Sequence, residues 1–210
     1  MNKGLFITLE GPDGSGKTTI ATAIVKTLEE QGREVVHTRE PGGVRIAEEI
    51  RNVILDPANT EMDAKTEALL YAASRRQHLT ERVIPALEEG KVVLCERFLD
   101  SSLAYQGSGR QIGFDAVLEI NRFAIGTYMP DLTLYLDIDE EKGLARIKDR
   151  AFKDRLDVES VAFHHRVVQG YKEVLKRFPE RIRIVNADQT VEEVLHDCMQ
   201  IIEEALNGDR

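Results

Sequence analysis

Glycine, lysine and threonine occur near the start of the chain in an order that can bind phosphate. Residues 11–18 are Gly-Pro-Asp-Gly-Ser-Gly-Lys-Thr, a match to the pattern G-x-x-x-x-G-K-[ST]. The glycines let successive backbone N–H groups turn inward around an anion, Lys17 can reach the β- and γ-phosphates, and the Thr18 hydroxyl can bind Mg²⁺. We therefore expect a loop that binds a nucleoside triphosphate. Its residues are Gly11, Pro12, Asp13, Gly14, Ser15, Gly16, Lys17, Thr18 and Thr19.

The segments on either side of this motif support that interpretation. An apolar run at 5–9 precedes the motif, and Ile20, Ile24 and Leu28 follow it at helical spacing, which predicts a strand, the loop and then a helix. Such a helix directs the positive end of its dipole at the phosphates. The alternative is a flexible glycine loop between a strand and a helix, but this order of residues is rare by chance.

A carboxylate and an arginine follow a second apolar segment. Residues 91–96 are typical of a parallel strand buried on both faces, and they end in Glu96, with Arg97 directly after. Ligands of open parallel sheets bind beyond the carboxyl ends of the strands, so both side chains are expected beside the phosphate loop. Glu96 suits a magnesium-water or base role and Arg97 a phosphate role. A structural ion pair is the alternative.

Two further segments carry polar chemistry. The longest expected helix, 63–89, places Tyr71 and Arg75 one turn apart, where a ring and a guanidinium could grip a planar heterocycle. Their spacing alone, however, favours ordinary packing against a neighbouring helix. Residues 100–113 are dense in hydrogen-bonding side chains and poor in apolar ones. We expect a short helix there that passes into a glycine-rich loop around a substrate.

Strands and helices alternate along the whole chain. Apolar runs at 33–38, 132–136 and 183–185 are expected to be the remaining strands, separated by amphipathic helices. This alternation predicts an α/β fold, a three-layer α/β/α sandwich around a five-stranded parallel sheet, with right-handed crossovers. We expect a single domain over 1–210.

A basic segment interrupts the helical pattern late in the chain. Arg146, Arg150 and Arg155 bracket this break, which we expect to be a lid at about 146–157 that folds over the triphosphate. A solvated basic turn is the alternative. The helix that follows carries His165 on its apolar stripe, and we expect this side chain to be half-buried and structural.

Composition and charge limit the function further. The 210 residues are 42% hydrophobic and 31% charged, as in an ordinary globular domain. A net charge of −9 and a pI near 5.2 argue against nucleic acid as the main partner. The first residues are too short an apolar run for a signal sequence or membrane span, and Cys95 and Cys198 lack metal-ligand spacing. We expect a cytoplasmic protein with two reduced core thiols, no membrane partner and no nucleic-acid partner.

Several blocks of the chain together resemble one enzyme family. They are residues 6–19, 38–43, 70–75 with His78, 96–98 and 100–107. Over essentially its whole length the chain resembles bacterial thymidylate kinase. The resemblance implies the P-loop NTPase fold and transfer of the γ-phosphate of MgATP to dTMP, giving dTDP for dTTP synthesis. It also implies Mg²⁺ as the cofactor and a homodimer.

The resemblance also assigns roles within a dTMP site. For the sugar and phosphate, Asp13 would hold the 3′-hydroxyl, Tyr105 would crowd the 2′ position, and Arg51 and Arg97 would clamp the phosphate with Glu40 nearby. For the base, Tyr71 would stack on the thymine, Arg75 would bind its O4 edge, and Ser102 and Gln106 would bind N3 and the neighbouring edge.

Catalytic roles follow from the same resemblance. The catalytic residues it implies are Lys17, Glu96, Arg97 and a lid arginine, and the metal ligands are Thr18 and Glu96, directly or through a water. The family usually has Asp-Arg where this chain has Glu96 and Arg97. Gly14 stands where eukaryotic-type members place a catalytic arginine, so the missing charge would come from Arg150 or Arg155. The sequence leaves that choice open.

Other functions are compatible with a phosphate loop. A GTPase would normally carry an Asn-Lys-x-Asp segment, which does not occur in this chain. A deoxynucleoside kinase shares the loop and often a Glu-Arg pair, but its uncharged acceptor would not need Arg51 as a phosphate clamp. A nucleotide-dependent regulator without turnover is the alternative from another class.

Overall fold

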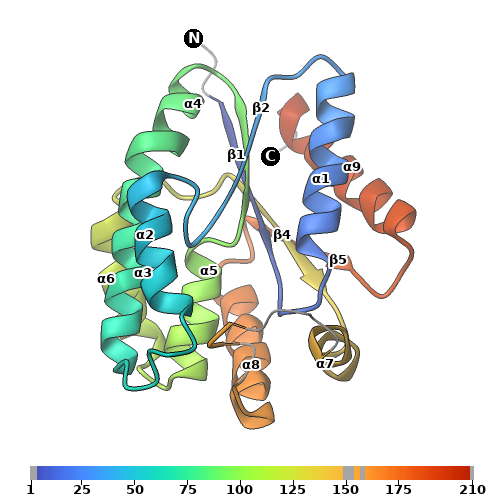
Figure 1. The fold of residues 1–210 in the computed structure, drawn as a ribbon. Coiled ribbons are helices and arrows are strands. Elements are labelled where there is room, and N and C mark those ends of the chain that lie inside the picture. Colours follow the sequence, from blue (N-terminus) through green and yellow to red (C-terminus); the bar gives the residue numbers. More distant parts are fainter. Residues whose placement is uncertain (1–3, 149–153, 157–158, 209–210) are drawn as a thin grey trace.

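Five parallel strands form the centre of the molecule, and helices cover both faces of their sheet (Figure 1). The computed structural model describes residues 4–148, 154–156 and 159–208. The strand order β2-β3-β1-β4-β5 confirms the expected α/β sandwich. The strands are β1 Leu5–Glu10, β2 Val35–Arg39, β3 Val92–Glu96, β4 Leu132–Asp137 and β5 Ile182–Asn186. The helices are α1 Lys17–Glu30, α2 Arg45–Leu55, α3 Ala64–His78, α4 Ile84–Glu88, α5 Leu99–Ser102, α6 Phe114–Ile125, α7 Glu140–Lys148, α8 Val161–Arg177 and α9 Val191–Asn207, with π-helical segments η1 Leu79–Val83 and η2 Leu103–Gly109.

The strands are apolar on both sides because each face of the sheet covers a separate core. Ile7 and Leu9 of β1 pack in the core under α1 and α9, while Phe6 packs in the core under α4, α5, α6 and α8. β1 lies between β3 and β4, and Ile7 is paired with Leu94 on one side and Leu132 on the other. The carboxyl ends of these three strands therefore lie together at one end of the sheet.

The helix expected over 63–89 begins as predicted and then changes its winding. The Asp63 side chain caps it by accepting hydrogen bonds from the backbone N–H groups of Lys65 and Thr66. The segment continues through η1 into α4, where Pro85 lacks the N–H that an α-helix would use at that position. Leu69 of α3 is 56% exposed although it is apolar.

The short helix expected at the start of 100–113 is confirmed, but it continues to Gly109, so the expectation of a glycine-rich loop is wrong up to that residue. Residues 99–109 are helical and almost wholly buried, and Leu99 and Leu103 belong to the core. The glycines serve packing here, because a Cβ on Gly109 would lie 2.8 Å from the ring of Phe163 in α8. The polar side chains of this segment therefore project from a rigid helix instead of from a loop.

The apolar face of α8 also differs from the expected stripe. His165 is not half-buried, since its side chain is 58% exposed and hydrogen-bonds to Glu140. The buried positions of α8 include His164, directly before His165, and Phe163, Val167 and Tyr171 in the core. Neighbouring apolar residues on both sides of the true face made the stripe ambiguous.

The two cysteines are buried and unpaired, as expected for separate core thiols. Cys95 packs in one core and Cys198 in the other. Burial raises the pKa of the Cys198 thiol to about 12, which leaves it uncharged at neutral pH. Among the residues that the structure describes, no helix combines the length and apolar character needed to cross a bilayer.

Candidate active site

The phosphate loop connects the end of β1 to the start of α1, as the motif predicts. Gly14 has a left-handed φ of 81°, and a Cβ there would lie 2.2 Å from the carbonyl oxygen of Gly143 in α7. Gly16 caps α1 with a φ of 87°, so the helix starts directly behind the loop. The loop N–H groups and the helix dipole thus point to the same end of the sheet.

Lys17 is held against the loop that precedes it. Its amino group donates to the carbonyl oxygens of Gly11 at 3.0 Å and Pro12 at 2.8 Å, and its side chain is buried. Burial, with help from the nearby Arg97, lowers the pKa of Lys17 to about 7, against the opposing effect of Asp13. A phosphate anion in the loop would favour the charged ammonium.

Thr18 and Glu96 meet beside the loop and fit a hard divalent cation. The Thr18 hydroxyl donates to Glu96 Oε2 at 2.6 Å, and His37 Nε2 lies 3.0 Å from Glu96 Oε1. Burial would raise the pKa of Glu96, but the hydrogen bonds from His37 and Thr18 outweigh it and lower the pKa. A hydroxyl and an ionised carboxylate are the oxygen donors that Mg²⁺ prefers. Glu96 bonds to His37 and Thr18 and not to Arg97, its neighbour in sequence.

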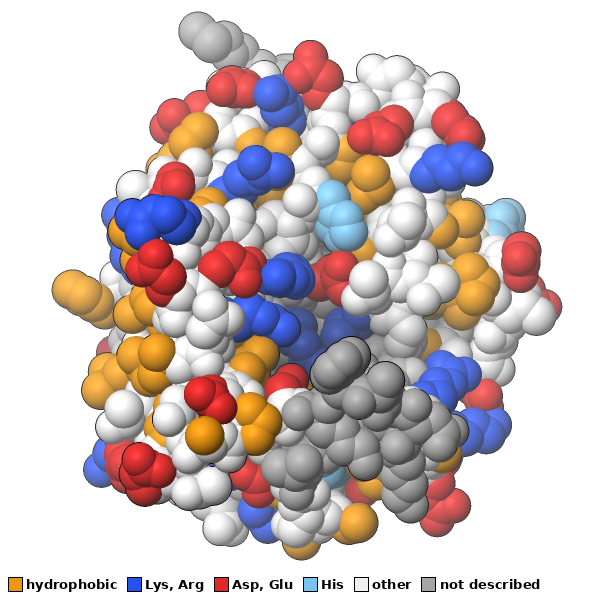
Figure 2. All heavy atoms as spheres, in the orientation of Figure 1, with side chains coloured by type: hydrophobic (Ala, Val, Ile, Leu, Met, Phe, Trp, Pro, Cys, Tyr) orange, Lys and Arg blue, Asp and Glu red, His pale blue; other side chains and the backbone are white. Residues whose placement is uncertain are grey.

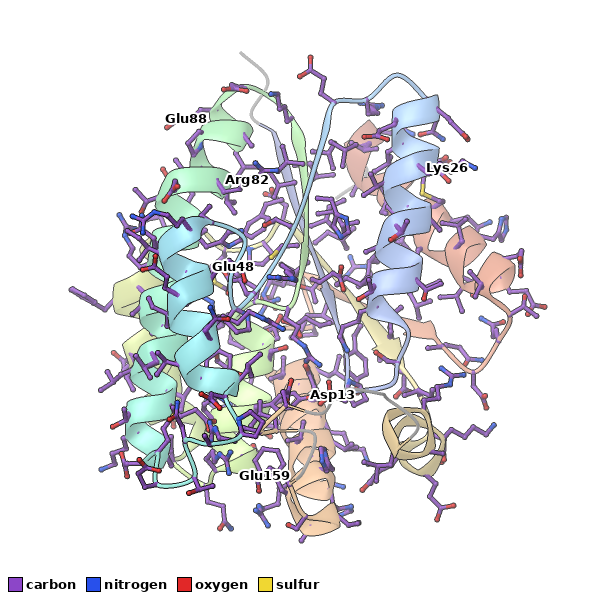
Figure 3. All side chains as sticks on the ribbon, viewed as in Figure 1. Asp13, Lys26, Glu48, Arg82, Glu88 and Glu159 are labelled. Carbon is purple, nitrogen blue, oxygen red and sulfur yellow. The ribbon has the colours of Figure 1, made fainter. Side chains whose placement is uncertain are left out.

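Arg97 turns away from Glu96 and reaches the phosphate loop. Its backbone has a left-handed φ of 65°, uncommon for a residue with a side chain, and its guanidinium pairs with Asp13. The Tyr105 hydroxyl donates to the other oxygen of Asp13 at 2.6 Å, and the Arg97 guanidinium lies 5.0 Å from the Tyr105 ring centroid. Asp13 lies at the carboxyl end of the sheet, above α8 in Figure 3.

A cleft of about 540 Å³ opens next to this group of side chains. All nine residues that the sequence analysis assigned to a dTMP site line this cleft, although they come from six segments of the chain. They are Asp13, Glu40, Arg51, Tyr71, Arg75, Arg97, Ser102, Tyr105 and Gln106. We call it the acceptor cleft. The sequence analysis did not assign the other lining residues, whose types carry no signal for such a site: Pro41, Leu55, Ser101, Asp154 and Leu156.

Arg75 is fixed at the base of the acceptor cleft. Its Nε donates to Glu40 Oε2 at 2.7 Å, and its Nη1 donates to Ser102 Oγ at 3.1 Å and to Asn121. Glu40 is held in turn by His78 Nδ1 at 2.9 Å. The alternative of simple helix packing is therefore incomplete: Arg75 is buried, but it is buried in a polar network that borders a cleft.

A second cleft of about 960 Å³ extends over the phosphate loop. Its lining includes Lys17, Thr18, Glu96 and Arg146, and it shares Asp13, Glu40, Arg51, Arg97 and Asp154 with the acceptor cleft. We call it the donor cleft. Figure 2 shows lysine and arginine side chains gathered around a hollow in this face of the molecule. Because Arg51 and Arg97 border both clefts, an anion in either one lies near the same two cations.

The basic segment at 146–157 divides into parts with different contacts. Arg146, which we had not placed in the site, donates from Nη1 to the Gly14 carbonyl at 3.0 Å and lines the donor cleft. Arg155 is buried, pairs with Glu67 and donates to the Ile54 carbonyl at 2.9 Å, so its guanidinium does not line the donor cleft. Arg150 lies outside the described residues. Arg146 lies in α7, the short helix that follows β4, and this position was the available signal.

Comparison with known proteins shows the family to which the chain belongs. The family model for thymidylate kinase matches residues 9–198. The chain is 60% identical over 209 residues to thymidylate kinase from Bacillus licheniformis, covering 99% of each chain, and 60% identical over 199 residues to that from Clostridium novyi, covering 94% of this chain and 97% of the relative. The crystal structure of thymidylate kinase from Ehrlichia chaffeensis aligns with a TM-score of 0.77 at 30% identity, over 96% of this chain and 99% of that one. The resemblance is confirmed, and the chain belongs to the thymidylate kinase family.

Proposed function

We propose that this chain transfers the γ-phosphate of MgATP to dTMP, giving dTDP for the synthesis of dTTP. The single observation that supports this reaction most strongly is the pair of clefts that share Arg51 and Arg97. A kinase with a charged acceptor needs cations where the two phosphates meet. An uncharged nucleoside acceptor would leave Arg51 without a ligand, which disfavours a deoxynucleoside kinase.

The transfer proceeds by direct in-line attack. A dTMP phosphate oxygen attacks the γ-phosphorus, and the ADP oxygen leaves on the opposite side. Lys17 and Arg97 neutralise the charge on the transferred group, while Arg146 supplies a further cation above the loop. Thr18 and Glu96, directly or through a water, would hold Mg²⁺, which would supply positive charge beside the donor phosphates. No covalent enzyme intermediate is required.

The acceptor cleft selects the thymidine part of dTMP. Tyr71 offers a ring for stacking on the base, Arg75 offers donors to O4, and Ser102 and Gln106 offer partners for N3 and its neighbouring edge. Asp13 accepts a hydrogen bond from the 3′-hydroxyl. Tyr105, fixed by its hydrogen bond to Asp13, crowds a 2′-hydroxyl and favours deoxyribose.

The test is a coupled ADP-release assay with MgATP and four acceptors in parallel: dTMP, dUMP, ribothymidine monophosphate and thymidine. We expect a strong preference for dTMP, with dUMP next and thymidine inactive. Activity on thymidine but not on dTMP would assign the chain to the nucleoside kinases. Nucleotide binding without turnover on any acceptor would favour the regulator.

The homodimer is a second proposal that rests on the resemblance and on exposed apolar residues. Val53, Leu69 and Phe123 are 48%, 56% and 94% exposed, and they belong to α2, α3 and α6, the helices grouped on one side of Figure 1. Exposed apolar side chains on neighbouring helices are typical of a subunit interface. Phe123→Ser should shift the protein toward monomer in sedimentation velocity. Ile184→Ser, at a position 60% exposed on β5, is the matched control and should not.

The cytoplasmic location, the absence of membrane and nucleic-acid partners, the single domain and the lid at 146–157 stay predictions. Of the lid, residues 149–153 and 157 lie outside the described residues.

A further inference from the structure

A buried carboxylate lies behind the acceptor cleft without lining it. Glu67, in the first turn of α3, has no exposed surface, and three side chains from two other segments bond to it. Gln106 Nε2 donates to its Oε1 at 2.9 Å, Arg110 Nε donates to both its oxygens at 3.1 and 3.2 Å, and Arg155 Nη2 pairs with its Oε2. Gln106 itself lines the acceptor cleft, and so do the two residues on either side of Arg155.

The bond from Gln106 fixes which end of its amide faces the cleft. An ionised carboxylate only accepts hydrogen bonds, so the NH₂ group of Gln106 must turn toward Glu67. Burial would raise the pKa of Glu67, but hydrogen bonds from Arg110, Gln106 and Arg155 outweigh it and hold the pKa below its ordinary value. Glu67 is thus ionised at neutral pH. The amide oxygen of Gln106 remains as an acceptor for an N–H of the base.

The bond from Arg155 fixes a second part of the wall. Besides pairing with Glu67, Arg155 donates from Nε to the Ile54 carbonyl at 2.9 Å, and its backbone N–H donates to the Leu55 carbonyl at 3.2 Å. Its sequence neighbours Asp154 and Leu156 both line the acceptor cleft. Arg155 therefore holds the turn 154–156 in place against the end of α2.

Arg110 helps to balance the charge of Glu67 but does not contribute to the cleft wall. It bonds to Glu67 and to Glu159 at 2.5 Å, and its guanidinium lies 4.8 Å from the Phe163 ring centroid. Figure 3 shows Glu159 beside α8, below Asp13 in this view. Arg110 does not line the acceptor cleft. It offers a matched control, because its loss disturbs the same buried charge cluster without touching the two wall contacts.

We propose that Glu67 is a positioning residue for the acceptor. It orients Gln106 to accept from a base with an N–H at position 3, as in thymine and uracil, and holds Arg155 so that Asp154 and Leu156 close the cleft wall. Cytosine has an acceptor at that position and is rejected by the oriented amide oxygen. Arg155 thus acts on dTMP binding and not on the transferred phosphoryl group. This inference rests on the proposed function.

The first variant is Glu67→Gln, which keeps the shape but removes the fixed direction of the hydrogen bond. We expect the KM for dTMP to rise at least about tenfold, with the KM for ATP and kcat at saturating dTMP changed only a few-fold. The ratio of kcat/KM for dTMP to that for dCMP should fall by a similar factor. An unchanged KM and an unchanged dTMP-to-dCMP ratio would overturn the proposal.

Glu67→Gln leaves two buried arginines without their carboxylate, which threatens folding, so Arg155→Met and Arg110→Met are measured beside it. Arg155→Met should raise the KM for dTMP and the Kd for dTMP by calorimetry, with kcat within a few-fold of the parent. Arg110→Met should lower Tm while the KM for dTMP stays within about twofold.

Two results with these variants would contradict the proposal. A fall in kcat of about 10³ or more in Arg155→Met, with the KM for dTMP unchanged, would make Arg155 a transition-state arginine. An equal rise in the KM for dTMP in Arg110→Met would mean that any disturbance of the cluster weakens binding. The parent protein is assayed on dTMP first, because its inactivity would reject the proposed function and not this inference.

Discussion

The donor and acceptor clefts share five lining residues but are built in opposite ways. The phosphate loop is one continuous stretch of sequence, and the glycines within it determine its backbone conformation. The acceptor cleft is assembled from side chains whose partners are far away in sequence. Arg97 pairs with Asp13, 84 positions earlier, and Arg75 bonds to Asn121, 46 positions later. The phosphate loop of the donor cleft can be recognised from a short motif, whereas the acceptor cleft forms only in the folded chain.

The difference predicts how each cleft responds to mutation. A change in the phosphate loop removes a group that acts on the reacting phosphates, so kcat should fall. A change in the acceptor cleft loosens one member of a network of partners, so KM and selectivity for the acceptor should change more than kcat. The following variants can break or sharpen this contrast.

The largest effect is expected for Lys17→Met. Removing the cation from the phosphate loop should lower kcat by at least about 10² to 10³ while the KM for dTMP changes little. Lys26→Met is the control, because Lys26 lies on the same helix but its side chain is 78% exposed (Figure 3). Near-normal turnover of the Lys17 variant in steady-state assays would refute the role of the loop.

The next largest effect is expected for Arg75→Lys in the acceptor cleft. Lysine keeps a charge for Glu40 but cannot reproduce the fork of donors that also reaches Ser102. We expect the KM for dTMP to rise roughly 10- to 100-fold, with the KM for ATP unchanged. Arg76→Lys, the adjacent exposed position, should behave like the parent. A loss confined to kcat would break the contrast between the clefts.

Proton uptake on ATP binding should reveal the titration of Lys17 in the donor cleft. Lys17 has a pKa near 7 in the free protein, and triphosphate binding should raise it toward the ordinary value of 10.5. Binding of ATP at pH 8 should therefore take up close to one proton more in the parent than in Lys17→Met, as measured by calorimetry in buffers of different ionisation enthalpy. Equal uptake by the two proteins would exclude the lysine as the source.

The same shift sets the sign of a stability effect. The unfolded chain binds more protons at Lys17 than the folded chain does between pH 7 and 10.5. The contribution of Lys17 to the free energy of unfolding should therefore increase as pH rises through this window. Denaturant titrations should show that the free energy of unfolding of the parent, relative to that of Lys17→Met, increases as pH rises from 7 to 10.5.

The smallest effect is expected for Tyr105→Phe. The ring remains, but Asp13 loses a donor at 2.6 Å, so Asp13 should be less well oriented toward the 3′-hydroxyl. We expect the KM for dTMP to rise about three- to tenfold. Tyr128→Phe, a partly buried position outside both clefts, is the control. A variant indistinguishable from the parent would show that the Tyr105 hydroxyl does not matter to the acceptor.

The sequence was sufficient where local rules decide the structure. The strand, loop and helix around Lys17 and the cap at Asp63 follow from residue types and spacing. The sequence was misleading where tertiary packing decides it. Gly109 indicated a loop, but it lets η2 approach Phe163, and the apolar residues near His165 did not reveal which face α8 buries.

The basic segment at 146–157 shows, within the site, that sequence alone could not predict what tertiary contacts decide. Arg146, Arg150 and Arg155 are the same residue type in one short stretch, and spacing could not separate them. In the fold, Arg146 contacts the Gly14 carbonyl, whereas Arg155 pairs with Glu67 beneath the other cleft. The choice depends on contacts with residues more than 80 positions away, which no local pattern contains.

The most direct test of the account is a single-turnover reaction of excess protein with γ-³²P-labelled MgATP and dTMP, followed by separation of nucleotides, free phosphate and protein. We predict that the label passes from ATP to dTDP without appearing on the protein or as free phosphate, and that Lys17→Met slows this transfer. Label on the protein, or release of free phosphate without dTDP, would contradict direct transfer between the two clefts.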